Sequence, residues 1–282
     1  MVSFQFFVES SPPLIQIIMM KKYVNILFIF FSTFFLCQKI TVADTLDKTP
    51  IPYAEVIVNG NSYFSDSLGI IQLKHQNETS IRIKKTGYID KNISSFDSIA
   101  YLNPKVIDIR EVIIKEKKDI EYNDRYLKQN ATNLPNDLTI GFIIEGEKKK
   151  IGKIKEISIP IKRIYNNETL LKIDFYDNTD DGISKEPLNT EAIILNVNDL
   201  IKKSNNKIDL KDFNIPFDES VLVSLRIIDQ TGTTKKKFKD PSIQFYNSKS
   251  KGKIYFYNQY SNKWQILSRN LNLISISYVI SY

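Results

Sequence analysis

Alternating apolar and polar positions between residues 49 and 88 predict several short β-strands. In the clearest run, Glu55 and Ile57 alternate with three residues on the opposite face, namely Ala54, Val56 and Val58. Asn59-Gly60 follows this run, and the pair favours the positive backbone angles of a tight hairpin turn. The pattern therefore predicts two paired strands that meet at this turn, with one face buried.

A second turn is predicted by Asp66 and Gly69, which suit the first and last positions of a type I turn. Ile71 and Leu73 follow on one face, so we expect a second hairpin there. Farther along, apolar residues again alternate with charged ones in the order Ile81, Arg82, Ile83, Lys84. Gly87 then permits a sharp reversal of the chain. The pattern therefore predicts β-sheet over residues 49–88.

The order of these features resembles the carboxypeptidase regulatory-like domain, a small transthyretin-like β-sandwich common in cell-envelope proteins of Bacteroidetes-type bacteria. The residues that carry the resemblance are Pro52, Ala54, Val56, Asp66, Gly69, Ile83, Gly87 and Tyr88. The resemblance extends over residues 40–117, and residues 108–114 look like the family's closing strand. It implies a Greek-key sandwich, although residues 40–44 lack the glycine usual in the first strand.

Downstream, short apolar runs recur between turn residues, and no convincing helical pattern separates them. The runs cover residues 154–161, 170–176, 192–197, 221–228, 242–246, 253–257, 263–268 and 273–280. Residues 118–137 are polar and aperiodic, so we expect a linker there. The predicted fold class is all-β: a transthyretin-like Greek-key sandwich at residues 38–117, followed by a jelly-roll-type β-sandwich at residues 138–282.

Two further observations bear on this second half. The segments 171–176, 186–188 and 208–210 resemble the β-sandwich that often follows regulatory-like domains in envelope proteins. A small outer-membrane barrel is the alternative, because residues 274–282 alternate and end on an aromatic residue. Charged strand positions such as Lys155-Glu156 favour the sandwich.

The N-terminal part contains a candidate export signal, in which lysines precede an apolar run over residues 23–36. We expect a secretory signal peptide at residues 1–37, with translation starting at Met19 or Met20. The mature protein would then lack an integral membrane span and lie in the periplasm, on the outer membrane surface or outside the cell. A membrane anchor and a lipid on Cys37 are the alternatives.

The composition excludes several classes of function. With 42% hydrophobic and 25% charged residues in 282, the chain has the balance of a folded protein. The net charge of +7 is spread among acidic residues, so we expect no nucleic-acid partner. Cys37 is the single cysteine, which excludes an internal disulfide, and His75 is the single histidine. A zinc carboxypeptidase, which needs two histidines, is therefore excluded.

An aromatic cluster is the first candidate binding site. One predicted hairpin contains Tyr255, Tyr257, Tyr260 and Trp264. Aromatic faces on a β-sandwich can stack against sugar rings or peptide side chains, and an indole does so while ordering few torsions. Packing in the core is the competing interpretation, because aromatic residues in strands are commonly buried.

Acidic residues suggest two further sites. Asp177, Asp180 and Asp181 supply the oxygen ligands that calcium prefers, but Leu188 stands where an EF-hand loop needs its glutamate. An ordinary turn is the favoured interpretation, and this structural calcium is the single cofactor that we consider. Asp174 and Asp177 are candidates for a pair of catalytic carboxylates, although nothing in the sequence locates a partner acid at a fixed separation.

The sequence therefore favours an exported, non-enzymatic cell-envelope protein. Its second sandwich would bind a carbohydrate, a peptide or an envelope protein. A carboxylate-dependent hydrolase of envelope polymers and a structural spacer of an envelope complex are the alternatives.

Overall fold

A computed structural model describes residues 38–73, 81–94, 97–105, 118–134, 138–166, 169–202, 204–229, 243–258 and 261–282. Several sequence predictions lie outside these residues: the signal peptide at residues 1–37 with Cys37, His75, the closing strand at residues 108–114, and Tyr260. Strands account for most of the described residues and regular α-helices for none of them, which confirms the all-β prediction. Their helical parts, the 3-10 turns η2 (Val197–Asp199) and η3 (Lys211–Phe213), are too short to cross a membrane.

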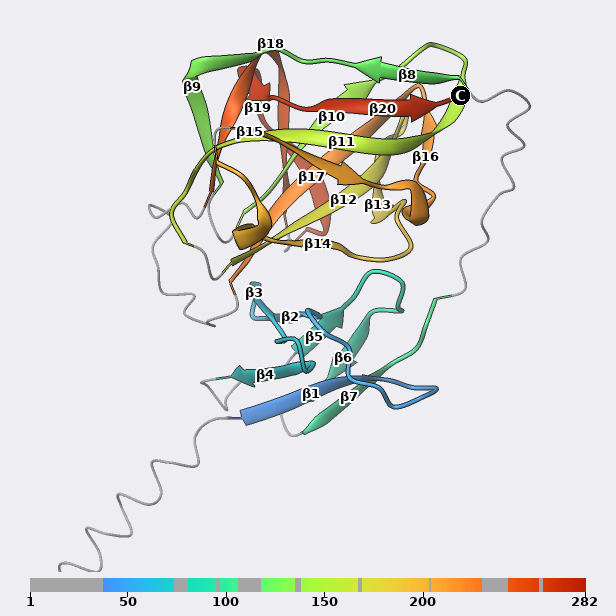
Figure 1. Cartoon of the computed structure of the whole chain (residues 1–282). Helices are drawn as coiled ribbons and strands as arrows, with labels where there is room; N and C mark the ends of the chain where they lie inside the picture. Colours follow the sequence, from blue (N-terminus) through green and yellow to red (C-terminus); the bar gives the residue numbers. More distant parts are fainter. Residues whose placement is uncertain are drawn as a thin grey trace, which may run out of the picture.

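The strands β1 to β7 form two small sheets, called the N-terminal sheets below (Figure 1). One has the order β4-β1-β7 and the other the order β3-β2-β5-β6. Their bounds are β1 (Gln38–Asp44), β2 (Glu55–Val58), β3 (Asn61–Phe64), β4 (Ile70–Leu73), β5 (Ile81–Lys84), β6 (Lys91–Ile93) and β7 (Ile99–Leu102). A shared core lies between them, and it includes Ile40, Val42, Val56, Val58, Ile71, Leu73, Ile81 and Ile83.

Both predicted turns form, but only the first connects two strands that pair with each other. Asn59 and Gly60 have φ angles of 49° and 78°, and they connect β2 to β3 as the predicted hairpin. Asp66 accepts hydrogen bonds from the turn that follows it, and Gly69 has a φ of 71°. The hairpin predicted here is wrong, because β3 pairs with β2 whereas β4 pairs with β1. This turn instead carries the chain from one sheet to the other.

The strands β8 to β20 form one large sheet. Its path is β13-β12-β17-β10-β18-β11-β20-β8, with β14 on β12, β15 and β16 on β11, and β9 and β19 on β18. The bounds are β8 (Asp119–Tyr122), β9 (Tyr126–Leu134), β10 (Thr139–Glu145), β11 (Ile151–Ile164), β12 (Thr169–Thr179), β13 (Gly182–Pro187), β14 (Ile193–Asn196), β15 (Ser204–Asp209), β16 (Pro216–Asp218), β17 (Ser220–Asp229), β18 (Ile243–Asn258), β19 (Lys263–Ile274) and β20 (Ser277–Ser281).

The long strand β18 lets this sheet fold over into two layers (Figure 1). Its first half pairs with β9 and β11, and its second half pairs with β10 and β19. Two runs predicted as separate strands, residues 242–246 and 253–257, are therefore parts of one strand. The layers enclose a second core, whose largest fully buried side chains are Phe175, Phe217 and Phe245.

The sequence predicts a linker at residues 118–137, and the structure corrects this prediction. The segment contains β8, which pairs with β20, and β9, which pairs with β18. The sequence of β9 is largely polar, with mostly exposed or half-buried side chains, so it lacks the alternation that marks a strand with one buried face. The sequence of β8 does alternate, but over four residues only. The order comes from the ladders to β18 and β20, which are formed far along the chain.

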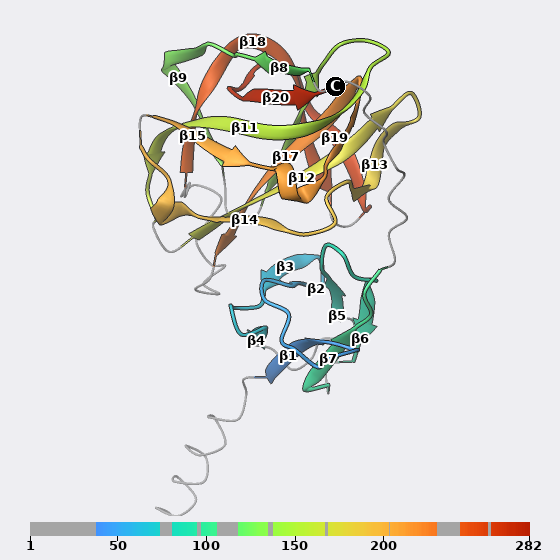
Figure 2. The same cartoon turned by 45° about the vertical axis from the view of Figure 1, so that its right-hand side comes forward.

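The N-terminal sheets lie next to one face of the large sheet in both views (Figure 1, Figure 2). This face, called the outer face below, carries Asp174 and Tyr176 of β12 and Arg226 of β17, which line one cavity together with Glu55. Arg226 donates to the Glu55 carboxylate of β2 at 2.8 Å. Ile57 shares the Glu55 face of β2 and is 7% exposed, because that face packs toward the large sheet.

Candidate functional site

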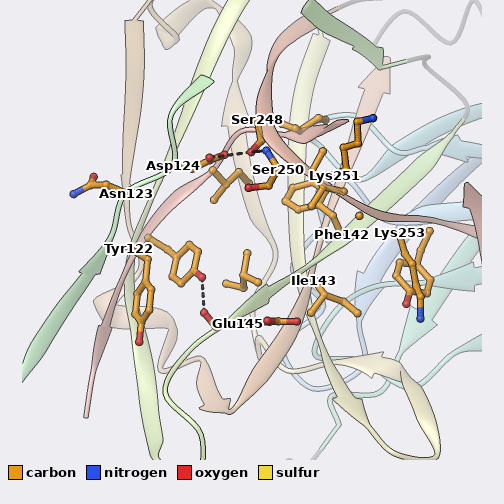
Figure 3. A pocket seen from close by; sticks show the side chains of 17 residues that line it. Tyr122, Asn123, Asp124, Phe142, Ile143, Glu145, Ser248, Ser250, Lys251 and Lys253 are labelled. Carbon is orange, nitrogen blue, oxygen red and sulfur yellow. Dashed lines mark hydrogen bonds between the residues drawn. The ribbon is translucent and has the colours of Figure 1, made fainter. Parts of the chain in front are cut away.

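A groove with a volume of about 590 Å³ lies at the bend of β18 (Figure 3). It is bordered by the end of β8, by β10, by the middle of β18 and by the loop from β19 to β20. The full lining is Tyr122, Asn123, Asp124, Phe142, Ile143, Ile144, Glu145, Ser248, Ser250, Lys251, Gly252, Lys253, Tyr255, Leu273, Ile274, Ile276 and Tyr278. We call this set the groove.

The groove exists because the pairing between β10 and β18 ends after a short ladder. These strands pair at Ile140–Phe256 and Gly141–Tyr255, and no further pairs follow along β10. Beyond that point β18 bends, and its register with β19 shifts between Asn247 and Lys251. Asn272 donates to the Ser248 carbonyl at 2.8 Å, and this contact holds the bend against β19. The two layers of the large sheet therefore separate at the bend of β18.

Apolar side chains form the floor of the groove. Phe142 and Ile144 come from β10, Ile274 ends β19, and Ile276 lies in the loop from β19 to β20. All four are buried in the large-sheet core. Because the core fixes their positions, the floor is rigid, and it offers an apolar surface to a ligand.

Tyrosines form part of the groove wall. Tyr122 and Tyr278 stack with ring centroids 4.8 Å apart, and the Tyr278 hydroxyl donates to the Glu145 carbonyl at 2.5 Å (Figure 3). Burial raises the pKa of Tyr278 to about 12, and burial also raises the pKa of Tyr122 and of Tyr255. All three phenols are therefore neutral at physiological pH, so they can both donate and accept hydrogen bonds.

Carboxylates and lysines stand around the rim. Asp124 accepts a hydrogen bond from the Ser248 hydroxyl at 2.9 Å, and its own N–H donates to Ser277 at 3.0 Å. Glu145 is exposed at the end of β10, and Lys251 and Lys253 project from β18 (Figure 3). The groove thus combines an apolar floor with polar groups of both signs, a mixture that suits a ligand with apolar and hydrogen-bonding parts.

Of the described residues of the predicted aromatic site, one lies in this groove and two lie elsewhere. Tyr255 lines it, whereas Tyr257 and Trp264 lie together on the outer face, as neighbours across β18 and β19. Trp264 makes edge contacts with Tyr257 and with Tyr176, at centroid distances of 5.3 and 5.1 Å. A Cβ added to Gly141 would come within 3.0 Å of the indole, so Trp264 lies tightly over β10.

The acidic residues singled out in the sequence separate in the structure. Asp177 belongs to β12, whereas Asp180 and Asp181 form the turn before β13. Over the described ranges, no group of three acidic, histidine or cysteine side chains converges on a metal position. Asp174 is buried and ion-paired with Lys172 at 2.9 Å, and Asn189 donates to it at 3.2 Å.

Charged residues line a smaller cavity, of about 100 Å³, between the N-terminal sheets and the outer face. Glu55 accepts from Arg226 and, at 2.6 Å, from the Ser62 hydroxyl. Burial opposes ionisation of Glu55, but these two partners together with the charge of Lys172 outweigh it and lower the pKa of Glu55. Lys85 donates to the Pro52 carbonyl at 2.8 Å, and burial lowers its pKa to about 8.

Sequence reasoning missed most residues of the groove. Tyr122 and Asp124 fall in the segment expected to be a linker, and Glu145 ends β10, a strand that was not predicted. Tyr278 lies in a predicted strand, but nothing local shows that it stacks on Tyr122. The one available signal was the aromatic content of residues 253–257, which does contribute Tyr255.

No family model matches the chain, and no curated protein matches it. Among solved structures it is similar to the cysteine protease and lectin-like domains of a surface layer associated protein of Clostridium difficile, with 12% identity and a TM-score of 0.34 over 85% of this chain and 54% of that one. It is also similar to the VP2 subviral particle of infectious bursal disease virus, with 11% identity and a TM-score of 0.27 over 87% of this chain and 55% of that one.

A third structure is a protein described as a candidate carbohydrate binder from Bacteroides uniformis. It shows 11% identity and a TM-score of 0.20, over 87% of this chain and 97% of that one. The chain spans about half the length of the first two structures. At these TM-scores the likenesses assign neither a family nor a ligand.

Proposed function

We propose that this protein is a non-enzymatic binding module that holds a segment of an external polymer, a glycan or a peptide, in the groove. The observation that carries the proposal is the groove itself: about 590 Å³ of space with an apolar floor and neutral tyrosines on a rigid sheet. Ligand pockets in proteins typically measure about 300–1,000 Å³ and combine apolar walls with a few placed polar groups.

The contacts among the polar groups favour binding over catalysis. The Asp124 carboxylate holds the Ser248 hydroxyl, and the Tyr278 hydroxyl is committed to the Glu145 carbonyl. Because these four groups are fixed by their partners, this part of the site is preorganised, and little of its side-chain entropy is lost when a ligand enters. A preorganised, shallow and mixed surface of this kind suits recognition of a polymer segment.

The place of action is part of the same proposal. Export to the cell envelope is supported by the apolar segment at residues 23–36. Assignment of residues 38–117 to the carboxypeptidase regulatory-like domains is supported by the order of the turn residues and by the pairing of β1 to β7 into two small sheets. In this proposal the N-terminal sheets support the large sheet, which carries the groove on β8, β10 and β18.

Glycan and peptide arrays probed with two matched variants test the proposal. Ser250 is exposed in the groove, so Ser250→Trp should fill the groove without disturbing the core. Ser261 is exposed in the β18–β19 turn, away from the groove, so Ser261→Trp is the matched control. We expect ligands captured by the natural protein to be retained by Ser261→Trp and lost by Ser250→Trp.

Two results would contradict this assignment. Binding that survives Ser250→Trp but disappears in a folded Trp264→Ala protein would place the site at the aromatic hairpin instead. Turnover of a bound glycan or peptide would replace the binding module with the hydrolase alternative, and its loss in Asp174→Asn would locate the reaction on the outer face.

A further inference from the structure

The pairing register shows which backbone groups of β10 face the groove. Gly146 donates its N–H to the Glu219 carbonyl at 2.8 Å, in register with the β10–β17 ladder, so even-numbered residues of β10 point their backbone groups toward β17. Odd-numbered residues therefore point theirs toward β18. Gly141 uses its groups in the pairing with β18, and the Glu145 carbonyl, which accepts from Tyr278, points the same way.

Ile143 lies between these two odd-numbered residues. The ladder from β10 to β18 ends at Gly141, so within the described part of the chain no residue of β18 pairs with Ile143 on this side. Ile143 lines the groove, which is the space that a further strand would fill. A row of backbone N–H and C=O groups without a ladder partner is a template for pairing with another chain.

We propose that the groove binds an extended peptide segment, which adds a strand to β10 by hydrogen-bonding to the backbone of Ile143 and to the N–H of Glu145. This inference rests on the proposed function and narrows its ligand from a polymer to a peptide. Each strand residue advances about 3.3 Å, so residues 142–145 of β10 accommodate about four peptide residues. Tyr278, which holds the Glu145 carbonyl, marks the end of the free edge.

The walls of the groove determine which side chains of a bound peptide would fit. Successive side chains of a strand point to opposite faces. On the core side the added strand meets the apolar floor of Phe142, Ile144, Ile274 and Ile276. On the other side it meets Glu145 and the lysines of β18. The preferred ligand is therefore a segment in which apolar residues alternate with polar ones.

N-methylated peptides test this pairing directly. The probe is an N-acetylated, C-amidated peptide of about six residues in which valine and threonine alternate. It is compared with two derivatives, in which either the valine or the threonine nitrogens are methylated. Alternate N–H groups of a strand point to opposite edges, so one derivative loses every donor toward β10 and the other loses none.

We expect the parent peptide to bind the full chain, in calorimetry and in amide NMR shifts of residues 141–145. One methylated derivative should lose about tenfold or more in affinity, and the other should bind within about twofold of the parent. Ile143→Pro removes an N–H that faces the groove but no bond of the β10–β17 ladder, so a folded Ile143→Pro chain should also bind less tightly.

Equal effects of the two methylated derivatives would overturn strand addition, as would absence of binding by the parent peptide. If the peptide fails while a glycan still binds and is excluded by Ser250→Trp, the peptide assignment is wrong and the proposed function stands. If no glycan or peptide is excluded by Ser250→Trp, both fail. The peptide comparison decides the matter even where Ile143→Pro does not fold.

Discussion

Lys85 shows how a single buried charge affects this fold. Its ammonium donates to the Pro52 carbonyl beside the outer face, and burial lowers its pKa to about 8 from 10.5. Lys172 lowers the pKa further, and Asp174 raises it. The folded chain therefore holds a proton on Lys85 less readily than the unfolded chain does. Below about pH 8 it carries a partly desolvated charge that disfavours folding.

Replacing this lysine should therefore stabilise the protein at neutral pH. Between about pH 8 and pH 10.5 the unfolded chain binds more protons at Lys85, so this group makes the natural protein more stable as the pH rises. We expect Lys85→Met to raise the free energy of unfolding by about 1–3 kcal/mol at pH 7, and the gain to shrink by pH 10. Urea denaturation at both values measures it.

The neighbouring lysine provides the control. Lys84 forms an ion pair with Asp90 at 3.4 Å and donates to Asn262 at 3.1 Å, so Lys84→Met should give no gain at pH 7. A Lys85→Met protein that is less stable than the natural one at both pH values would show that the Pro52 hydrogen bond outweighs the cost of the buried charge.

At the scale of elements, the sequence predicts best those strands whose apolar residues either alternate with polar ones or form a continuous run. The strands β2, β5, β11, β12 and β17 match predicted runs, because their apolar residues alternate or form continuous buried runs. In contrast, β9 carries a polar sequence and is ordered by its ladder to β18. No local pattern can reveal a strand whose order depends on a partner more than a hundred residues away.

The groove illustrates the same limit. It depends on the early separation of β18 from β10 and on the stacking of Tyr122 against Tyr278, which are contacts between distant segments. The sequence identified Tyr255 because aromatic residues cluster near it, and it grouped Tyr255 with Trp264 because they share a hairpin. The structure divides this group, since Tyr255 lines the groove whereas Trp264 packs on the outer face.

At the scale of the whole molecule, the contact of β2 with β17 connects the N-terminal sheets to the large sheet. Arg226 and Glu55 lie 2.8 Å apart with both side chains largely buried, and the Arg226 guanidinium also lies 4.7 Å from the Phe64 ring centroid. Removing one member of such a pair leaves the other buried and uncompensated, which typically costs about 3–5 kcal/mol.

A double-mutant cycle should reveal this coupling. We expect Glu55→Gln and Arg226→Met each to lower the free energy of unfolding by about 2–4 kcal/mol, and the double variant to lose less than the sum, with a coupling of about 1–3 kcal/mol. The exposed pair Lys105–Glu186, at 3.4 Å, is the control and should couple by less than about 1 kcal/mol. Equal coupling in both pairs would mean that Glu55–Arg226 does not connect the sheets.

Hydrogen exchange of the full chain, with and without a ligand captured on the arrays, tests the binding role of the groove most directly. If the groove binds the ligand, we expect slower exchange in residues 139–146, where the edge of β10 faces the groove, and unchanged exchange in β12 and in β19 around Trp264. Protection around Trp264 with none in β10 would contradict this expectation and would assign ligand binding to the aromatic hairpin on the outer face.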